Sequence, residues 1–449
     1  MSTTTLSSAE LRSSTPINGL LNKPVPGWRR AIVVALCFVI VAIEGFDAAI
    51  IGFVAPQVAE QFGAMPGQVS LAISAGMLGL LLGYLVGGPQ ADRRGRKPVL
   101  IVGIAVFGIA TVATAFSGTL TQLIAWRLVT GIGIGAAMPA MSALLAEILP
   151  ATRRASILSA VFCGFLFGSA AAGILTGQLI DSIGWHGLFV MGGIAPLVVL
   201  PLMLMLVPES PQFLLVNGKT QEKVRDALRK IGIAPPSGTE IALVATGEQG
   251  EAGGLRALFG PHLRLTSMLI WALMFLILGS FYVIASYLPT MLKASGVSLA
   301  VASKTAALFQ TGGLVGAVVG SIVIRKLSPM KLVWMALLLG AATPLILSAP
   351  AQSGLYNASI FVAGVLISGP IVVINAVIVM FYPTAVRSTG AGWANSMGRL
   401  GSFVCAGSIG WLVQQGISLQ NVIASVSIAI FICAVLAFFL SRNVPTTRD

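Results

Sequence analysis

The stretch GPQADRRGRK, residues 88 to 97, places one acid and four basic residues between two long apolar segments. The segment before it covers about residues 70 to 90, and the segment after it covers about 98 to 117. A helix needs roughly 20 apolar residues to cross a bilayer, and both segments are that long. The stretch therefore predicts a charged turn between two membrane-spanning helices.

The composition of the whole chain supports this interpretation. Of its 449 residues, 56% are hydrophobic and only 9% are charged, whereas roughly 25% of residues are charged in a soluble domain. The formal net charge of +13 would favour a nucleic-acid partner for a soluble chain. In this chain the basic residues gather in the connections between apolar segments, so we predict a lipid bilayer and no nucleic acid as the surroundings.

Twelve apolar segments can be identified, six on each side of a polar linker. They lie at about residues 31 to 55, 70 to 90, 98 to 117, 120 to 144, 155 to 179, 187 to 207, 267 to 290, 301 to 323, 331 to 349, 357 to 381, 388 to 413 and 420 to 440. We accordingly predict an all-α integral membrane protein with five parts: a tail (1–28), a six-helix bundle (29–207), a linker with amphipathic helices (208–265), a second six-helix bundle (266–441) and a second tail (442–449).

The distribution of Lys and Arg predicts the orientation of the chain. With the N-terminus inside, all but four of the 27 Lys and Arg residues fall in inner connections, which is the bias seen in membrane proteins. The exceptions are Lys293 and Lys304 at the outer surface, and Arg127 and Arg399 within spans. The first 28 residues lack the pattern of a cleaved signal peptide. We expect a multi-pass protein of the bacterial inner membrane, monomeric, with both termini in the cytoplasm.

An internal repeat relates the two halves. GPQADRRGRK follows the second span and GSIVIRKLSP (320–329) follows the eighth; PATRR (150–154) follows the fourth and PTAVR (383–387) follows the tenth, at nearly the same offset. Two homologous halves with a site between them are typical of transporters. The four cysteines lie in predicted helices and the two histidines lie far apart, so we expect no disulfide, no metal and no cofactor.

These motifs resemble those of a known family. GPQADRRGRK and RLVTGIGIG (127–135) are similar to the signature loop and fourth-helix motif of the major facilitator superfamily. EGFDAAIIGFVAP (44–56), LFQTGG (308–313) and FYPTAVRSTGAGWANSMGRLG (381–401) resemble its aromatic acid:proton symporters, which have Asp where this chain has Glu44 and commonly Arg where it has Gln212. The resemblance implies a conformational latch formed by Gly88, Asp92, Arg93, Gly95 and Arg96. In this latch, Gly95 would permit a tight turn. The Asp92 carboxylate would accept hydrogen bonds from a helix N-terminus.

Two acids in the first span are the strongest candidates for proton coupling. Glu44 and Asp47 are three residues apart and share one helix face. An ionisable group in mid-span costs roughly 2.5 to 3.5 kcal/mol on insertion scales, so a plain structural ion pair is the less favoured alternative. Burial and a like charge nearby both favour the protonated carboxyl, which a proton carrier requires.

Arg127 is the predicted partner of Asp47. At roughly 1.5 Å per residue, the two side chains lie at the same distance from the outer ends of their helices. We predict an Asp47–Arg127 pair that protonation loosens, with a purely structural tie as the alternative. The GIGIG run (131–135) lies in an apolar helix with no strand before it, so we interpret it as close helix packing and not as a nucleotide loop.

Arg399 is the candidate for binding an anionic substrate. It lies twelve residues beyond Arg387, roughly 18 Å into its span, and no acid of the second half is placed to pair with it. A structural role, with helix carbonyls or an acid of the first half, is the alternative. Further candidates, which could stack on a ring or bond its hydroxyls, are Gln310, Trp393, Asn395, Asn375, Tyr282, Tyr287 and Trp271.

The resemblance and the residues together predict a transporter and not an enzyme. The expected substrate is a small aromatic carboxylate, a hydroxylated benzoate such as 4-hydroxybenzoate, protocatechuate or gallate, imported with protons and driven by the proton gradient. Two alternatives stay open. One is a proton antiporter that exports amphipathic compounds, although the fifth span lacks the Gly-Pro pair of such antiporters. The other is a membrane sensor, for which a long soluble signalling domain would be expected.

Overall fold

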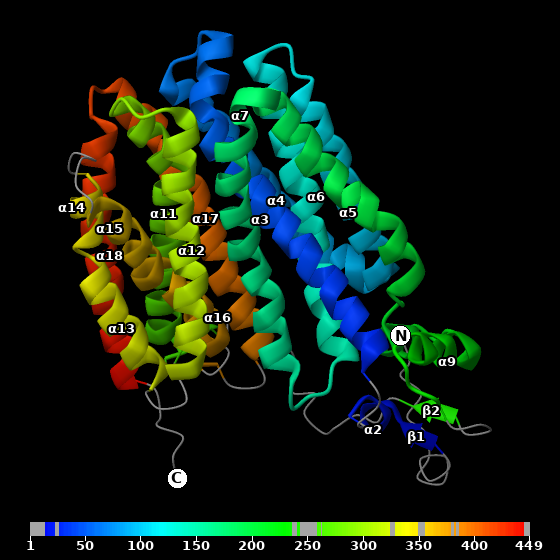
Figure 1. Cartoon of the computed structure of the whole chain (residues 1–449). Helices are drawn as coiled ribbons and strands as arrows, with labels where there is room; N and C mark the ends of the chain where they lie inside the picture. The colour runs from blue at the N-terminus through cyan, green and yellow to red at the C-terminus, as the bar shows by residue number, and fades with distance from the viewer. Residues whose placement is uncertain are drawn as a thin grey trace.

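The computed structural model describes residues 14–22, 27–235, 240–242, 258–261, 263–323, 328–348, 355–378, 381–382 and 386–443. Within these residues, ten helices are long and apolar enough to cross a membrane. Helix α7 holds two crossings and α17 supplies another, so each predicted span corresponds to helix in the structure. The predicted all-α membrane fold is confirmed (Figure 1).

The first four spans are separate helices, and the fifth and sixth are two helices joined by a sharp kink at Gly184 within the element α7. Their bounds are α3 (Trp28–Phe62), α4 (Pro66–Arg94), α5 (Arg96–Ala115), α6 (Leu120–Ile148) and α7 (Arg154–Leu206). Gly184 interrupts α7 with φ 62° and ψ −176°, a conformation that glycine adopts without a Cβ clash. The Gln57 side chain of α3 accepts a hydrogen bond from the Trp185 N–H at 2.9 Å, so the sixth span begins with a side-chain cap.

The second half contains more breaks. Its helices are α11 (Arg264–Ala294), α12 (Leu299–Val323), α13 (Pro329–Gly340), α14 (Thr343–Leu347), α15 (Leu355–Ala363), the π-helix η1 (Gly364–Ser368), α16 (Gly369–Ile378), α17 (Arg387–Gln414) and α18 (Leu419–Asn443). The predicted ninth span is thus divided between α13 and α14. The tenth passes through a π-helical turn, at which Gly364 packs against the carbonyl of Phe309 on α12.

The linker forms a small structure with residues of the N-terminal tail. It contains α8 (Pro211–Val216), α9 (Gln221–Lys230) and β2 (Glu240–Ala242), and β2 pairs in parallel with β1 (Ser14–Pro16), which α2 (Ile17–Leu21) follows. The apolar face predicted for α9 exists, but Val224, Ala227 and Leu228 are buried in a protein core with Ile17 and Leu20. From the sequence, the amphipathic linker helix 219–232 is expected to lay its apolar face on the cytoplasmic membrane surface. The structure corrects this expectation, because that face packs against protein. Of a second predicted amphipathic segment, 254–265, the structure describes residues 258–261 and 263–265, and α11 begins within it at Arg264.

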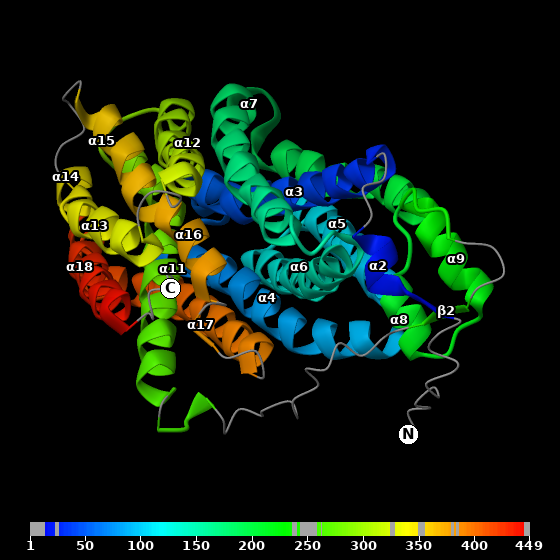
Figure 2. The ribbon, with the colours of Figure 1, turned by 90° about the horizontal axis from the view of Figure 1, so that it is seen from below.

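Three pairs of helices form the main contacts between the two halves. α4 packs on α17, α7 packs on α12, and α3 packs on α11. Viewed from below, α11, α13, α14, α15 and α18 lie on one side and α3, α5 and α6 on the other (Figure 2). We call the end with α8, α9, β1 and β2 the linker end. The end with the α3–α4 connection and Gly184 is the opposite end.

Close backbone contact between helices explains the glycine run in α6. A Cβ on Gly131 would collide with the backbone of Gly76 and Leu80, and one on Gly133 would collide with Phe107 and Gly103. Helices approach this closely in membranes when small residues line their interface. The packing interpretation of GIGIG is therefore confirmed.

Candidate functional site

Asp47 and Arg127 form a buried ion pair inside the first half. Arg127 Nη1 donates to both Asp47 carboxylate oxygens at 2.9 Å, and Nη2 lies 3.4 Å from the Asp47 carbonyl oxygen. The Thr111 hydroxyl of α5 donates to Asp47 Oδ1 at 3.1 Å. The side chains are only 1% and 5% exposed. The pair predicted from matched helix depths is present, and because it is buried, removal of one partner would leave a charge without compensation.

Phe189 completes the surroundings of Arg127. The guanidinium carbon lies 5.7 Å from the centre of the Phe189 ring, within the range of a cation–π contact. Phe189 belongs to the second crossing of α7, and its side chain is fully buried. Helices α3, α5, α6 and α7 thus all contribute to holding one charge pair, which makes the pair sensitive to any shift among them.

Arg399 lies where the two halves meet. Its Nη1 donates to the Tyr282 hydroxyl at 3.3 Å, and its guanidinium lies 5.6 Å from the centre of the Tyr84 ring. The Tyr84 ring thus contacts the Arg399 guanidinium through its face. Tyr84 comes from α4, while Tyr282 and Arg399 come from α11 and α17. The central cation is therefore bound by one phenol from each half.

Glu44 faces this cation from the first half. Its charge interacts with those of Arg399 and Asp47, and its side chain is 3% exposed. In the part of the chain that the structure describes, Glu44 has no ion pair and no hydrogen bond. The acid that the second half lacks is thus supplied by the first half. Among the described residues Glu44 forms no ion pair with Arg399, whose guanidinium donates to the Tyr282 hydroxyl.

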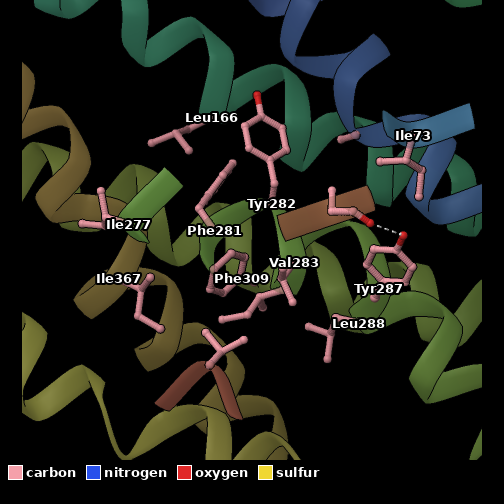
Figure 3. Packing of buried hydrophobic residues seen from close by; sticks show 14 of the residues in the cluster. Ile73, Leu166, Ile277, Phe281, Tyr282, Val283, Tyr287, Leu288, Phe309 and Ile367 are labelled. Carbon is pink, nitrogen blue, oxygen red and sulfur yellow. Dashed lines mark hydrogen bonds between the residues drawn. The ribbon is translucent and has the colours of Figure 1, made fainter. Parts of the chain in front are cut away.

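Aromatic rings surround the Tyr282 side of this site. Phe281 lies 6.0 Å from Phe309 and 6.4 Å from Phe165, measured between ring centres. Figure 3 shows Phe281, Tyr282 and Phe309 close together, with Leu166 beside Tyr282. Gln310, next to Phe309, is 2% exposed, and its Oε1 has no partner among the described residues. The site therefore combines aromatic surface with one cation, which suits a ring carrying a carboxylate.

The remaining candidates lie elsewhere. Trp271 and Trp393 stack on each other at 5.8 Å, about three helical turns from Tyr282 toward the linker end. Tyr287 donates to the Ala406 carbonyl at 2.9 Å, on the side of Tyr282 toward the opposite end. Asn375 and Asn395 are exposed and donate to carbonyls of their own helices at 3.0 Å. The structure thus brings Tyr282 and Glu44 to Arg399, whereas these five side chains stack on or bond to other groups.

The predicted latch is a network of charges at the linker end. Arg96 forms ion pairs with Glu147 at 2.9 Å and with Asp92 at 3.2 Å, and Gly95 turns the chain with φ 111°. The carboxylate that accepts from a helix N-terminus is Glu209, which bonds the backbone N–H of Arg96 at 3.0 Å. Glu209 therefore has the capping role predicted for Asp92.

Gly88 and Arg93 contribute less to this network. A Cβ on Gly88 would meet no atom within 4 Å, and the Arg93 side chain is exposed. The second copy of the loop, around Ile324 and Leu327, lies outside the described residues. Among the described residues no group of three metal-ligating side chains occurs, and the four cysteines are free.

Sequence reasoning missed Tyr84, Thr111, Glu147 and Glu209. Tyr84 sits in the apolar run LLLGYLVGG (80–88), and a lone tyrosine there gives no sign of which neighbour it faces. Glu209 could have been found, because PES (208–210) is the first acidic position after the sixth span. An acid at the linker end is within reach of the helix N-terminus that follows the charged turn.

Comparisons with known proteins agree with this architecture. Residues 37–406 match the family described as Major Facilitator Superfamily. The gallate transporter of Pseudomonas putida is 34% identical over 414 residues, which cover 92% of each chain. The 4-hydroxybenzoate transporter PcaK of Acinetobacter baylyi is 34% identical, with 96% of each chain covered. A partially occluded inward-open structure of the xylose transporter XylE from E. coli superposes with a TM-score of 0.71 at 18% identity, covering 93% of this chain and 98% of that one.

The fold, the signature loop and these matches define a secondary transporter of the major facilitator superfamily, to which this chain belongs. Its full-length similarity to carriers of gallate and 4-hydroxybenzoate places it among the superfamily's aromatic acid transporters. It is a multi-pass membrane protein and not an enzyme.

Proposed function

We propose that this transporter imports a hydroxylated benzoate together with protons. The observation that carries the proposal is the position of Arg399, between the halves, where it bonds the Tyr282 hydroxyl and contacts the Tyr84 ring. A guanidinium bonded to a neutral hydroxyl keeps its charge available for a carboxylate, and its planar fork fits a carboxylate bidentately. The rings of Phe281 and Phe309 offer an apolar surface to the benzene ring.

The substrate class draws support from the relatives. The names of the similar carriers refer to gallate, 4-hydroxybenzoate and 3-(3-hydroxyphenyl)propionate, all of which are aromatic acids with ring hydroxyls. The unpaired Gln310 Oε1 is a hydrogen-bond acceptor that a ring hydroxyl would satisfy. Protocatechuate, gallate and 4-hydroxybenzoate are therefore the compounds to test first.

Glu44 and Asp47 are the proposed proton sites. A proton on Glu44 would remove the negative charge that faces Arg399, which would leave this cation to the substrate carboxylate. A proton on Asp47 would weaken its bonds to Arg127, on which four helices of the first half converge. Proton binding would in this way favour substrate binding and also loosen the packing that fixes the first half.

Alternating access would follow from movement of one half against the other. The proposed moving bodies are the bundles 29–207 and 266–441, joined by the linker 208–265, with the latch of Asp92, Arg96 and Glu147 at the linker end. The proposed location is the bacterial inner membrane, with the linker end and both termini in the cytoplasm and the protein acting as a monomer. The abundance of basic residues at the linker end supports this orientation.

Transport in vesicles tests the proposal. In right-side-out vesicles with an acidic exterior, radiolabelled 4-hydroxybenzoate should accumulate inside, and collapse of the pH gradient should release it. Expulsion of the label under the same gradient would favour a proton antiporter. Binding without any movement would favour a membrane sensor, and either result would overturn the proposal.

A further inference from the structure

A cavity at the opposite end has no part in the central site. Its volume is about 450 Å³, and it lies between α3, α4 and α11. Sites for small ligands usually measure about 300 to 1,000 Å³ and combine apolar walls with a few polar groups. This cavity has the size for one benzoate, and its walls come from both halves of the protein.

The charged groups of the cavity are Glu60 and Lys293. Lys293 Nζ lies 3.5 Å from Glu60 Oε2, and the two side chains are 35% and 77% exposed. Exposed ion pairs of this kind contribute little free energy to folding. A ligand carboxylate can therefore replace Glu60 at Lys293 with only a small loss of stability. Lys293 is the only cation among the residues that line the cavity. The cavity thus offers one cation, which a monovalent organic anion can bind when it replaces Glu60 at Lys293.

The remaining wall suits an aromatic ring with a polar substituent. Val69, Ile73 and Tyr287 give apolar and aromatic surface. Thr290 also lines the cavity, and its Oγ1 is buried with no partner among the described residues. Because a buried polar atom without a partner costs free energy, a ligand hydroxyl that bonds Thr290 would gain affinity.

The cavity lies on the way to the central site. Tyr287, in its wall, is five residues beyond Tyr282 on α11, which corresponds to about 7.5 Å along the helix. Tyr282 is the residue that bonds Arg399. Figure 3 shows Ile73 and Tyr287 together on one side of Tyr282. The Tyr287 hydroxyl is fixed by its bond to the Ala406 carbonyl, which holds its ring in the cavity wall.

We propose that this cavity is a second binding site for the aromatic carboxylate, in which Lys293 pairs with the carboxylate. The ligand class rests on the proposed function; the existence of the site rests on the cavity, its cation and its unpaired hydroxyl. The acid occupies this outer site first and passes Tyr287 to reach Arg399. Glu60 competes with the acid for Lys293.

Equilibrium binding of radiolabelled 4-hydroxybenzoate to the purified full chain tests the second site. The parent protein should bind two equivalents, and Ile73→Trp, which fills the cavity, should bind one. Lys293→Ala should weaken the outer site about fivefold, as expected for loss of one exposed ion pair, and Glu60→Gln should strengthen it. Lys304→Ala removes another basic residue predicted at the outer surface but absent from the cavity wall, and it should change nothing.

The outcomes separate the two proposals. If the parent accumulates 4-hydroxybenzoate but binds one equivalent that Ile73→Trp and Lys293→Ala leave unchanged, the outer site is wrong and the proposed function stands. If the parent neither binds nor transports a hydroxylated benzoate, both proposals are wrong. Arg399→Ala provides a second measurement. This variant should lose the equivalent bound at the central site and keep the equivalent bound in the cavity, which Lys293→Ala weakens.

Discussion

One nitrogen of Arg127 bonds both carboxylate oxygens of Asp47, each at 2.9 Å, in the interior of the first half. The two residues come from α3 and α6, and their side chains are almost completely excluded from solvent. A charge pair in such a place is either a structural tie or a site that changes its protonation during function. Substitutions can distinguish these roles, because a tie affects stability alone.

Asp47→Asn should abolish proton-driven accumulation of substrate. The change leaves the Arg127 charge without its carboxylate, and breaking a buried pair typically costs about 3 to 5 kcal/mol. The double variant Asp47→Asn with Arg127→Gln removes the lone charge and should recover much of the lost thermal stability. Uptake in proteoliposomes and the unfolding temperature are the measurements.

A structural tie predicts a different result for the double variant. If the double variant regains both stability and accumulation, the pair holds helices together and does not couple protons. If Asp47→Asn alone accumulates substrate like the parent, Asp47 is not a proton site. Exchange of labelled for unlabelled substrate at equal pH should persist in the double variant, since exchange requires no net proton movement.

Arg399→Ala should weaken binding of 4-hydroxybenzoate by tenfold or more, the loss expected for a charge-assisted hydrogen bond. It should leave binding of the neutral 4-hydroxybenzamide unchanged, because the amide has no charge to pair. Tyr282→Phe removes one hydroxyl from the guanidinium and should give a smaller loss. Arg442→Ala, on α18 away from the site, serves as the matched control. Equal losses for acid and amide would assign Arg399 a structural role.

Gly131→Ala should lower the unfolding temperature by several degrees. The added Cβ meets backbone atoms of α4, which cannot move aside as a flexible side chain can, and overpacking of this kind typically costs about 1 to 3 kcal/mol. Gly392→Ala is the control, since a Cβ there meets no atom within 4 Å and alanine favours a helix. A similar fall for both variants would contradict the packing interpretation of the glycine run.

The helices were predictable because the bilayer imposes a length on every crossing. Hydropathy located each span within a few residues, and the matched depths of Asp47 and Arg127 followed from the rise of an α-helix. Hydropathy alone does not report backbone geometry, so the non-helical conformation of Gly184 between the fifth and sixth spans and the π-helical turn at Gly364–Ser368 were not predicted. Both features depend on contacts with neighbouring helices.

The site was predictable only in part, for a related reason. Charges in apolar segments stand out, so Glu44, Asp47, Arg127 and Arg399 could be identified one by one. Which aromatic residues approach Arg399 depends on the rotation of each helix, which composition does not give. Tyr84 was therefore missed, and Trp271 and Trp393, grouped with Arg399 by sequence, instead form a pair of their own.

The pairing of β1 with β2 gives the first half of the chain a closed path. The strand Ser14–Pro16 precedes the first crossing, the strand Glu240–Ala242 follows the sixth, and the two lie side by side in one parallel sheet. The segment that contains the six crossings thus begins and ends at the same small sheet. Ile17, Leu20 and Leu21 are buried next to this sheet. The connection to the second half therefore starts from an anchored position, Ala242, and not from the end of α7.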